Sequence, residues 1–157
     1  TARLGDRAQS LENMVAYASV QDMIDRFGET EMIRLSQPED RTAETVFTAK
    51  VEVAIADNSV LIDDYLRGLY IVPVAAPPDS MVRAVCVLAR YDLAKGERTD
   101  PTEQMRLDRK EVIGWLESIQ AGRAKINAPP ASTPGSGHGA RVSDRCDVFN
   151  DRNLRGW

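Results

Sequence analysis

The chain has 157 residues, of which 43% are apolar and 28% are charged, and its formal net charge is −4 with a pI near 5.1. This length suits one domain with a hydrophobic core and is too short for two comfortable ones. The acidic balance argues against a protein that holds nucleic acid through a basic surface. Residues 14–127 carry 14 Lys and Arg against 19 Asp and Glu, whereas residues 128–157 carry four Arg and three Asp, so the acidity belongs to the body.

Composition divides the chain into four segments. Residues 1–13 are polar and do not begin with Met, whereas Met14 resembles a natural start, so we expect 1–13 to be an extension or an added, non-native segment. Residues 14–127 carry the helical patterns of a single domain. Residues 128–140, APPASTPGSGHGA, have the composition of a flexible linker, and residues 141–157 regain apolar side chains as a C-terminal arm.

Two short helices are predicted at the start of the domain. Ser19 is a good N-cap and Asp22 follows at capping-box spacing, so the helix VQDMIDRF should begin there and end at Gly28. The second helix, TEMIRLS, has Thr30 as its predicted cap and leads into a turn at residues 37–40. The apolar side chains expected to be buried are Val20, Met23, Ile24, Phe27, Met32, Ile33 and Leu35.

The longest helical pattern runs from about Ala43 to Leu69, with no proline and no internal glycine before Gly68. A helix of about 26 residues would be roughly 39 Å long and could form the spine of a small bundle. Side chains at three- and four-residue steps define its predicted core face: Phe47, Val51, Ala54, Asn58, Leu61, Ile62, Tyr65 and Leu69. The acids Asp57, Asp63 and Asp64 fall off that face, and we expect them to be solvated or to face another subunit.

A proline-containing connection should follow the spine helix. Pro73, Pro77 and Pro78 exclude a helix, so the segment YIVPVAAPPDS is predicted to run extended across the bundle. Its apolar residues Ile71, Val72 and Val74 are expected to cover one end of the core.

Two further helices complete the predicted domain. The segment MVRAVCVLARYDLAKG, capped by Asp79 or Ser80 and ended by Gly96, is apolar on nearly all sides, which is typical of a buried central helix. The last helix is predicted to begin at Asp100-Pro101 and to end at Gly122. Its apolar stripe comprises Met105, Val112, Ile113, Leu116 and Ile119, with Trp115 beside it. The predicted fold is an all-α bundle of four to five helices, with an extended Pro-containing connection and a long non-globular C-terminal arm.

The cysteines and the hydropathy pattern indicate where the protein is made. Cys86 lies in the apolar central helix and is expected to be a buried thiol, and with Cys146 it makes no disulfide framework. A reducing environment is therefore favoured. Arg83 and the prolines interrupt every stretch that could span a membrane, and no signal peptide is evident, so we expect a soluble, intracellular product.

No catalytic arrangement is predicted. The only histidine, His138, lies in the linker without an orienting partner, and neither cysteine has a companion at metal-ligand spacing. Asp63 and Asp64 are neighbours on a helix and point about 100° apart, so they cannot share a proton or a metal. No phosphate-binding glycine loop or GxSxG motif occurs. We therefore expect no enzymatic activity, no metal and no cofactor.

Three hypotheses about function are considered: a structural protein without enzymatic activity, a DNA-binding protein and a small enzyme. The segment SVQDMIDRFGETEMIRLS has the outline of a helix-turn-helix, which would suit a small DNA-binding or packaging regulator. Its would-be recognition helix presents one Arg and one Glu, whereas a groove-reading helix presents more basic and amide side chains. A small helical enzyme is the third hypothesis, for which the sequence offers no residues to test.

The C-terminal arm is too short to fold alone. It is either a disordered end or a segment that folds on a partner, and its aromatic and arginine residues favour the second interpretation. The expected contact residues are Arg141, Val142, Val148, Phe149, Leu154, Arg155 and Trp157.

Four motifs occur in the order found in one phage family: AYASVQDMIDRFGETEMIRLS, LIDDYLRGLYIVPV, VCVLARYDLAKG and EVIGWLESIQAGR. With the ending VFNDRNLRGW, they make the chain from Met14 to Trp157, the linker excepted, resemble the Mu-like Gp36 family of phage and prophage structural proteins.

That family is similar to head–tail connectors, also called adaptor or head-completion proteins. The resemblance implies a homo-oligomeric ring, expected to have twelve subunits, beneath the portal protein at the neck of the virion. It also implies assembly in the host cytoplasm, contact with the next neck or tail protein, passage of DNA without sequence-specific binding, and no membrane association. The role of reaching the portal or a neighbouring subunit would fall on residues 141–157. Asp57, Asp63 and Asp64 would line the channel or contact a neighbouring subunit, because an acidic channel repels phosphates.

Overall fold

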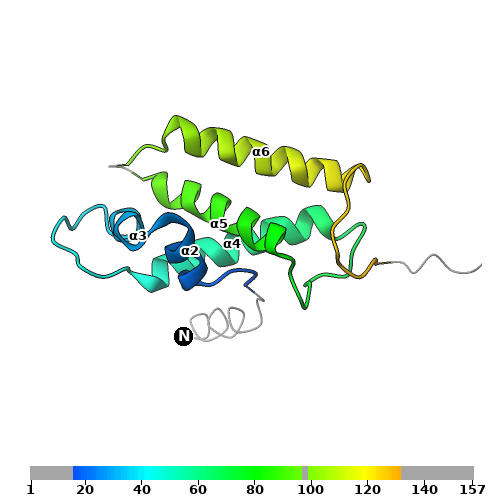
Figure 1. Cartoon of the computed structure of the whole chain (residues 1–157), viewed down its shortest axis with the longest axis horizontal. Coiled ribbons are helices and arrows are strands. Elements are labelled where there is room, and N and C mark those ends of the chain that lie inside the picture. Colours follow the sequence, from blue (N-terminus) through cyan, green and yellow to red (C-terminus); the bar gives the residue numbers. More distant parts are fainter. Residues whose placement is uncertain (1–15, 97–98, 132–157) are drawn as a thin grey trace, which may run out of the picture.

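The computed structural model of the protein describes residues 16–96 and 99–131 (Figure 1). The helices within these residues are α2 (Val20–Phe27), α3 (Glu29–Ser36), α4 (Thr48–Leu66), α5 (Asp79–Ala94) and α6 (Glu103–Gln120), and this part of the chain contains no strand. The predicted all-α bundle is confirmed. The predicted extension 1–13, the arm 141–157 and nearly all of the linker lie outside the described residues.

Three long helices run antiparallel to their neighbours in sequence. In Figure 1, α4 lies below α5 at the left and passes behind it towards the right, α6 runs above both, and α5 returns in the direction opposite to α4 and α6; α4 and α6 also contact one another. The short helices α2 and α3 pack on the α4–α5 pair and make no contact with α6. The pair α4–α5 is therefore the centre of the described domain, with α2 and α3 on one side and α6 on another.

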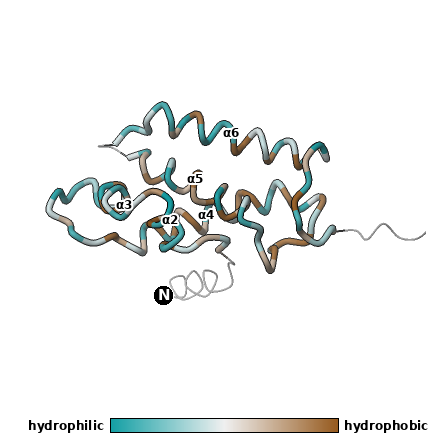
Figure 2. Tube along the Cα trace, in the orientation of Figure 1, coloured by the Kyte–Doolittle hydropathy of each residue, from teal (hydrophilic) through white to brown (hydrophobic). Residues whose placement is uncertain are grey.

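Helix α5 is the most completely buried element, as its nearly continuous apolar sequence predicts. It contacts each of the other four described helices. Its buried side chains include Met81, Val85, Cys86 and Leu88, each no more than 1% exposed. Figure 2 shows apolar residues concentrated in α4, α5 and the connection between them, while the loop before α4 is largely hydrophilic. Cys86 is buried as expected, and this burial raises the pKa of its thiol to about 11, so the thiol is protonated and unreactive at neutral pH.

The predicted limits of α2 are confirmed. The Ser19 side chain accepts a hydrogen bond from Asp22 N, and the Asp22 carboxylate accepts one from Ser19 N at 2.8 Å, which completes a capping box. These bonds from Ser19 lower the pKa of Asp22. Gly28 ends the helix with φ of 87°, a conformation that glycine adopts without strain.

The predicted starts of three other helices are wrong by one to three residues. Helix α3 begins at Glu29, so its cap is Gly28 and not Thr30, because the single glycine serves both helices. Pro78 rather than Asp79 or Ser80 precedes α5. Helix α6 is capped by Thr102, whose hydroxyl accepts from Met105 N at 3.3 Å, and not by Asp100. The Thr102 hydroxyl, and not the Asp100 carboxylate, therefore caps the first turn of α6.

The spine helix is shorter than predicted, because Thr48–Leu66 replaces the expected Ala43–Leu69. Before it, side chains bind the backbone in a non-helical arrangement. Asp40 accepts from Thr42 N at 2.8 Å, Gln37 donates to Thr45 O at 2.9 Å, and Ser36 accepts from Phe47 N at 3.1 Å. Such local bonds compete with helix formation.

The shortening of α4 removes both ends of its predicted core face. Phe47 is 52% exposed and Leu69 is 40% exposed, whereas Val51, Ala54, Asn58 and Ile62 are buried as predicted. The inward face also includes residues that the prediction omitted, which are Ile55, Ser59 and Leu66.

The connection after α4 is extended and partly covers the core. Val74 is buried and Val72 packs against the core, but Ile71 is exposed, so the prediction for Ile71 is wrong. The chain after α6 returns to this connection: Ile71 N donates to Pro129 O at 3.0 Å, and Ala131 N donates to Leu69 O at 2.9 Å. Residues 129–131 therefore lie beside the C-terminal end of α4.

Candidate interaction surfaces

The described residues contain no group of three or more His, Cys, Asp or Glu side chains that could hold a metal ion. No helix in this part of the chain is long and apolar enough to cross a membrane. His138, Cys146 and the predicted arm residues lie outside the described residues. The candidate sites that can be located are therefore the acids of α4 and the outer faces of the helices.

Asp63 does not lie on the open surface with Asp64. It accepts a hydrogen bond from the Tyr17 hydroxyl, and burial raises the pKa of its carboxyl group. Burial and the bond to Asp63 also raise the pKa of Tyr17 well above its usual range. The expectation of a solvated or subunit-facing Asp63 overlooked this bond, because the partner lies 46 positions earlier in the sequence.

Two more polar side chains of α4 are buried and satisfied. Asn58 donates to Ala54 O at 2.8 Å and to Asp92 Oδ2 at 2.7 Å, so it joins α4 to α5. Ser59 donates to Ile55 O and accepts from Tyr17 N at 3.1 Å. These bonds explain why a helix face with polar residues can lie in the core.

The opposite face of α4 carries the other two predicted acids. Asp57 and Asp64 are exposed, and Asp64 forms an i,i+3 ion pair with Arg67 at 3.2 Å. Asp64 follows Asp57 by seven positions, or two turns, which places both on one side of the helix. The same outer face carries two exposed valines, Val53 and Val60, which are 52% and 40% exposed. This combination of acids with exposed apolar side chains was not predicted.

The helix pair α2–α3 does not have the form of a DNA-reading motif. Only Gly28 separates the two helices, whereas a helix-turn-helix has a turn of about 3–4 residues. Glu31 of α3 is held by Arg90 of α5, with an N–O distance of 2.6 Å, and Arg90 also lies 4.5 Å from the centre of the Phe27 ring. The pair is thus fixed against α5 through a cation held between the two helices.

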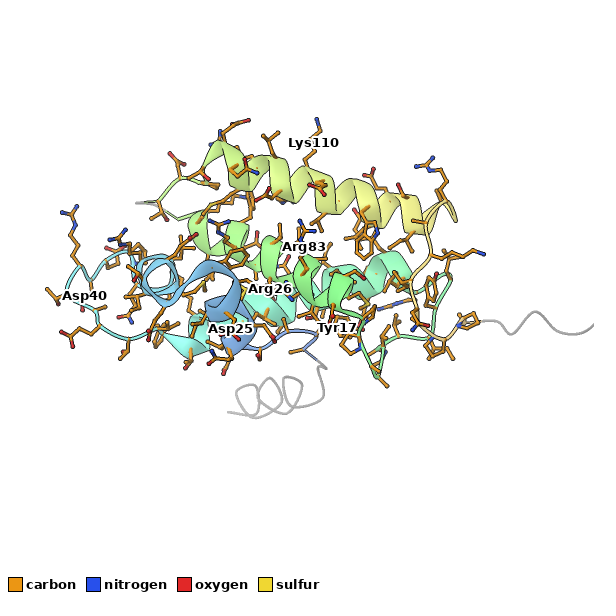
Figure 3. All side chains as sticks on the ribbon, in the orientation of Figure 1. Tyr17, Asp25, Arg26, Asp40, Arg83 and Lys110 are labelled. Atoms are coloured by element: carbon orange, nitrogen blue, oxygen red, sulfur yellow. The ribbon has the colours of Figure 1, made fainter. Side chains whose placement is uncertain are left out.

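Three of the hollows on the described surface lie near the helices discussed above. The first, of about 200 Å³, lies between α5 and α6 and includes Arg83 and Trp115; Figure 3 shows Arg83 between these helices. The second, of about 540 Å³, lies beside residues 37–43. The third, also about 540 Å³, lies on α6 and is lined by Tyr91, Arg106, Arg109, Lys110, Ile113, Gly114 and Glu117. It gathers three cations on an otherwise acidic chain, and Arg109 stacks on Tyr91 at 4.9 Å.

Taken together, these features define a small all-α protein whose described surface presents helix faces that combine charge with exposed apolar side chains. Comparison with known proteins names its family. The model of the family described as "Bacteriophage Mu, Gp36" matches residues 17–144. The chain therefore belongs to the phage Mu Gp36 family, as its motifs indicated, and is a phage or prophage protein. The match ends before VFNDRNLRGW, so that ending is not part of it.

Two relatives match along nearly their whole length. The Mu-like prophage FluMu protein gp36 of Haemophilus influenzae is 31% identical over 146 residues, which cover 92% of this chain and 99% of the relative. Gene product J of Escherichia phage Mu is 28% identical over 143 residues, which cover 90% of this chain and 98% of the relative.

Proposed function

We propose that this protein is a structural, non-enzymatic head–tail connector of a tailed phage or prophage. In this role it forms a ring on the portal at the neck of the virion, contacts the next neck or tail protein, and lets DNA pass. Membership of the Gp36 family and the resemblance of that family to connector proteins support the proposal.

The observation that carries the proposal is the outer face of α4. Two valines that are about half exposed at a two-turn spacing form a short apolar strip on one helix face. A protein that works inside an assembly can bury such a face against a neighbour. The acids Asp57 and Asp64 on the same face would keep the free subunit soluble and repel DNA phosphates wherever they remain exposed in the ring.

The arm supplies the second part of the proposed function. Residues 141–157 contain Phe149, Leu154 and Trp157 together with four arginines, a composition suited to anchoring on a partner protein. Residues 129–131, which precede the arm and most of the linker in the sequence, lie beside the end of α4. We propose the portal or a neighbouring subunit as the target of the arm.

Deletion of residues 141–157 tests this function. The truncated protein should keep the helical circular dichroism and cooperative melting of the full chain but should no longer bind purified portal protein, as measured by mass photometry of the mixture. A second variant replaces Phe149, Leu154 and Trp157 by serine in the full-length chain, which keeps the length and charge of the arm. This variant should also lose portal binding. Portal binding equal to that of the intact chain in both variants would refute the proposed role of the arm.

A DNA-binding regulator remains the alternative. It requires retention on DNA that weakens as salt rises. The connector proposal expects almost no retention even at low ionic strength, because the domain is acidic. Strong salt-dependent retention of the intact chain would favour the alternative.

A further inference from the structure

The exposed apolar side chains of this domain are not scattered over its surface. Among the described residues, five of the six large apolar side chains that are exposed belong to α4 and its two flanks, and the sixth is on α6: Phe47, Val53, Val60, Leu69, Ile71 and Leu107. We propose that the outer face of α4 in one copy binds the outer face of α6 in a second copy of this chain. This inference rests on the proposed function, for which it names the two surfaces that join neighbouring subunits.

The α4 face is apolar along its middle and acidic at its edge. Val53 and Val60 are two turns apart and therefore lie above one another, with the small residue Ala56 between them. Asp57 and Asp64 flank the valines at i,i+4 positions. Asp57 has no ion-pair partner within residues 16–96 and 99–131, so its charge is available to a neighbour.

The α6 face has the complementary character. Leu107 is 51% exposed, and Lys110 and Gly114 follow it at three- and seven-residue steps on the same side of the helix. Figure 3 shows the Lys110 side chain pointing away from the bundle. Arg106 lies one turn before Lys110 and is bound only loosely within its own helix, at 3.8 Å from Glu103. Arg106 and Lys110 thus border one side of the exposed leucine, while Glu103 and Glu111 lie one turn before and after it; on α4, Asp57 borders the exposed valines and Asp64 is paired with Arg67.

Gly114 adds a geometric argument. A glycine within a helix lowers helix stability, and a Cβ at position 114 would meet no atom within 4 Å, so packing inside the described domain gives no reason for it. A neighbouring helix can approach most closely where a side chain is missing. A valine of α4 from a second copy would fill the space above Gly114, one turn beyond Lys110.

The positions of the two faces determine what the contact builds. The proposed contact joins two different faces of the chain, the outer face of α4 and the outer face of α6. A contact between two different faces leaves one of each free on every copy, and it propagates head to tail until it closes as a ring. Opposite charges at its edges would set the orientation of the two helices.

Cross-linking between defined positions tests the proposal. In a Cys146→Ser background, which leaves only the buried Cys86, Val60→Cys and Leu107→Cys are made separately and together, and each protein is treated with a short thiol-to-thiol cross-linker. An equal mixture of the two single variants should give covalent dimers, each single variant alone should give few, and the double variant should give a ladder of larger species. Absence of dimers in the mixture, or equal cross-linking of either variant alone, would overturn the proposal.

Charge reversal provides the second measurement. Asp57→Arg in one component or Lys110→Glu in the other should lower the yield of mixed dimer about fivefold, and the two changes together should restore it, because the pair is then reversed rather than broken. Lys95→Glu, an exposed charge change at the end of α5, is the matched control and should leave the yield unchanged. An equal loss with Lys95→Glu would show that net charge, and not this contact, controls assembly.

The failure of this inference can be separated from the failure of the connector function. The mass of the intact chain mixed with portal protein reports whether subunits assemble at all. Oligomers on the portal without the Val60–Leu107 cross-link would overturn the α4–α6 contact and leave the connector function in place. A chain that never joins the portal, whatever its cross-linking pattern, would overturn the connector function itself.

Discussion

The hydroxyl group of Tyr17 donates a hydrogen bond to the carboxylate of Asp63, and this bond ties the segment before α2 to the last turns of α4. The same hydroxyl accepts a hydrogen bond from Val74 N at 2.9 Å, in the connection that leads to α5. Tyr17 is 3% exposed, and its backbone N–H donates to Ser59. One buried tyrosine therefore joins three segments that are distant in the sequence.

Replacing Tyr17 by phenylalanine should lower the free energy of unfolding by about 1–3 kcal/mol, because the half-buried Asp63 carboxylate and the buried Val74 N–H lose their partner while the ring volume is kept. Urea unfolding followed by circular dichroism measures the change. Tyr65→Phe is the control, since Tyr65 is half-buried and its hydroxyl makes no hydrogen bond within the described residues; its stability should remain near that of the parent. Equal effects of both substitutions would refute the role given to Tyr17.

Asp63→Asn should change the pH dependence of stability. Burial raises the pKa of Asp63 in the folded state above its value of about 3.8 in the unfolded state. The contribution of Asp63 to the free energy of unfolding is therefore fully present below the unfolded pKa and is lost as pH rises through the folded pKa. Asparagine keeps an oxygen acceptor for Tyr17 and does not titrate. The variant should therefore gain stability relative to the parent between about pH 3 and pH 7. A constant difference across this range would show that Asp63 has an unshifted pKa.

Asn58→Asp tests the connection between α4 and α5. Asn58 is 3% exposed and donates to Asp92, so an aspartate there would place a second carboxylate at about hydrogen-bond distance from the first. We expect a loss of roughly 2–4 kcal/mol at neutral pH from the buried, repelled charge. Adding Asp92→Asn should recover part of the loss, because the amide can donate to the new carboxylate. A double-mutant cycle without any coupling would contradict this account.

The features that the sequence predicted correctly depend on nearby residues or on a dominant pattern. Ser19, Asp22 and Gly28 set the limits of α2 through contacts no more than a few residues long. Gly122, with φ of 73°, ends α6, where Arg123 N donates to Ser118 O and Gly122 N to Ile119 O. The central position of α5 follows from apolar residues on nearly all of its sides. Such signals are readable without knowing the tertiary structure.

Most features that the sequence did not predict depend on contacts between residues that are distant in the sequence. The start of α4 was misplaced because Ser36 and Gln37 bind the backbone of residues 45–47, which no helical periodicity reveals. The role of Asp63 required a partner 46 residues away. The outer face of α4 was not predicted, although the seven-residue spacing of Val53 and Val60, on the side opposite Val51 and Ile62, is a usable signal.

Gly114 within α6 and Gly122 just after its end should respond in opposite directions to alanine. Gly114→Ala should stabilise the isolated chain by about 0.5–1 kcal/mol, because alanine favours the helix and its methyl group meets open space. Gly122→Ala should destabilise it by about 1–2 kcal/mol, because φ of 73° is costly for any residue with a Cβ. Thermal unfolding at equal protein concentration measures both. Destabilisation by Gly114→Ala would mean that the space above position 114 is occupied.

Electron microscopy of purified portal protein mixed with the intact chain tests the connector function most directly. A connector should add a ring of density on the portal, coaxial with its channel, and this ring should disappear when residues 141–157 are deleted. Portal particles identical to those without the added protein, at concentrations where the chain is folded and in excess, would contradict this function.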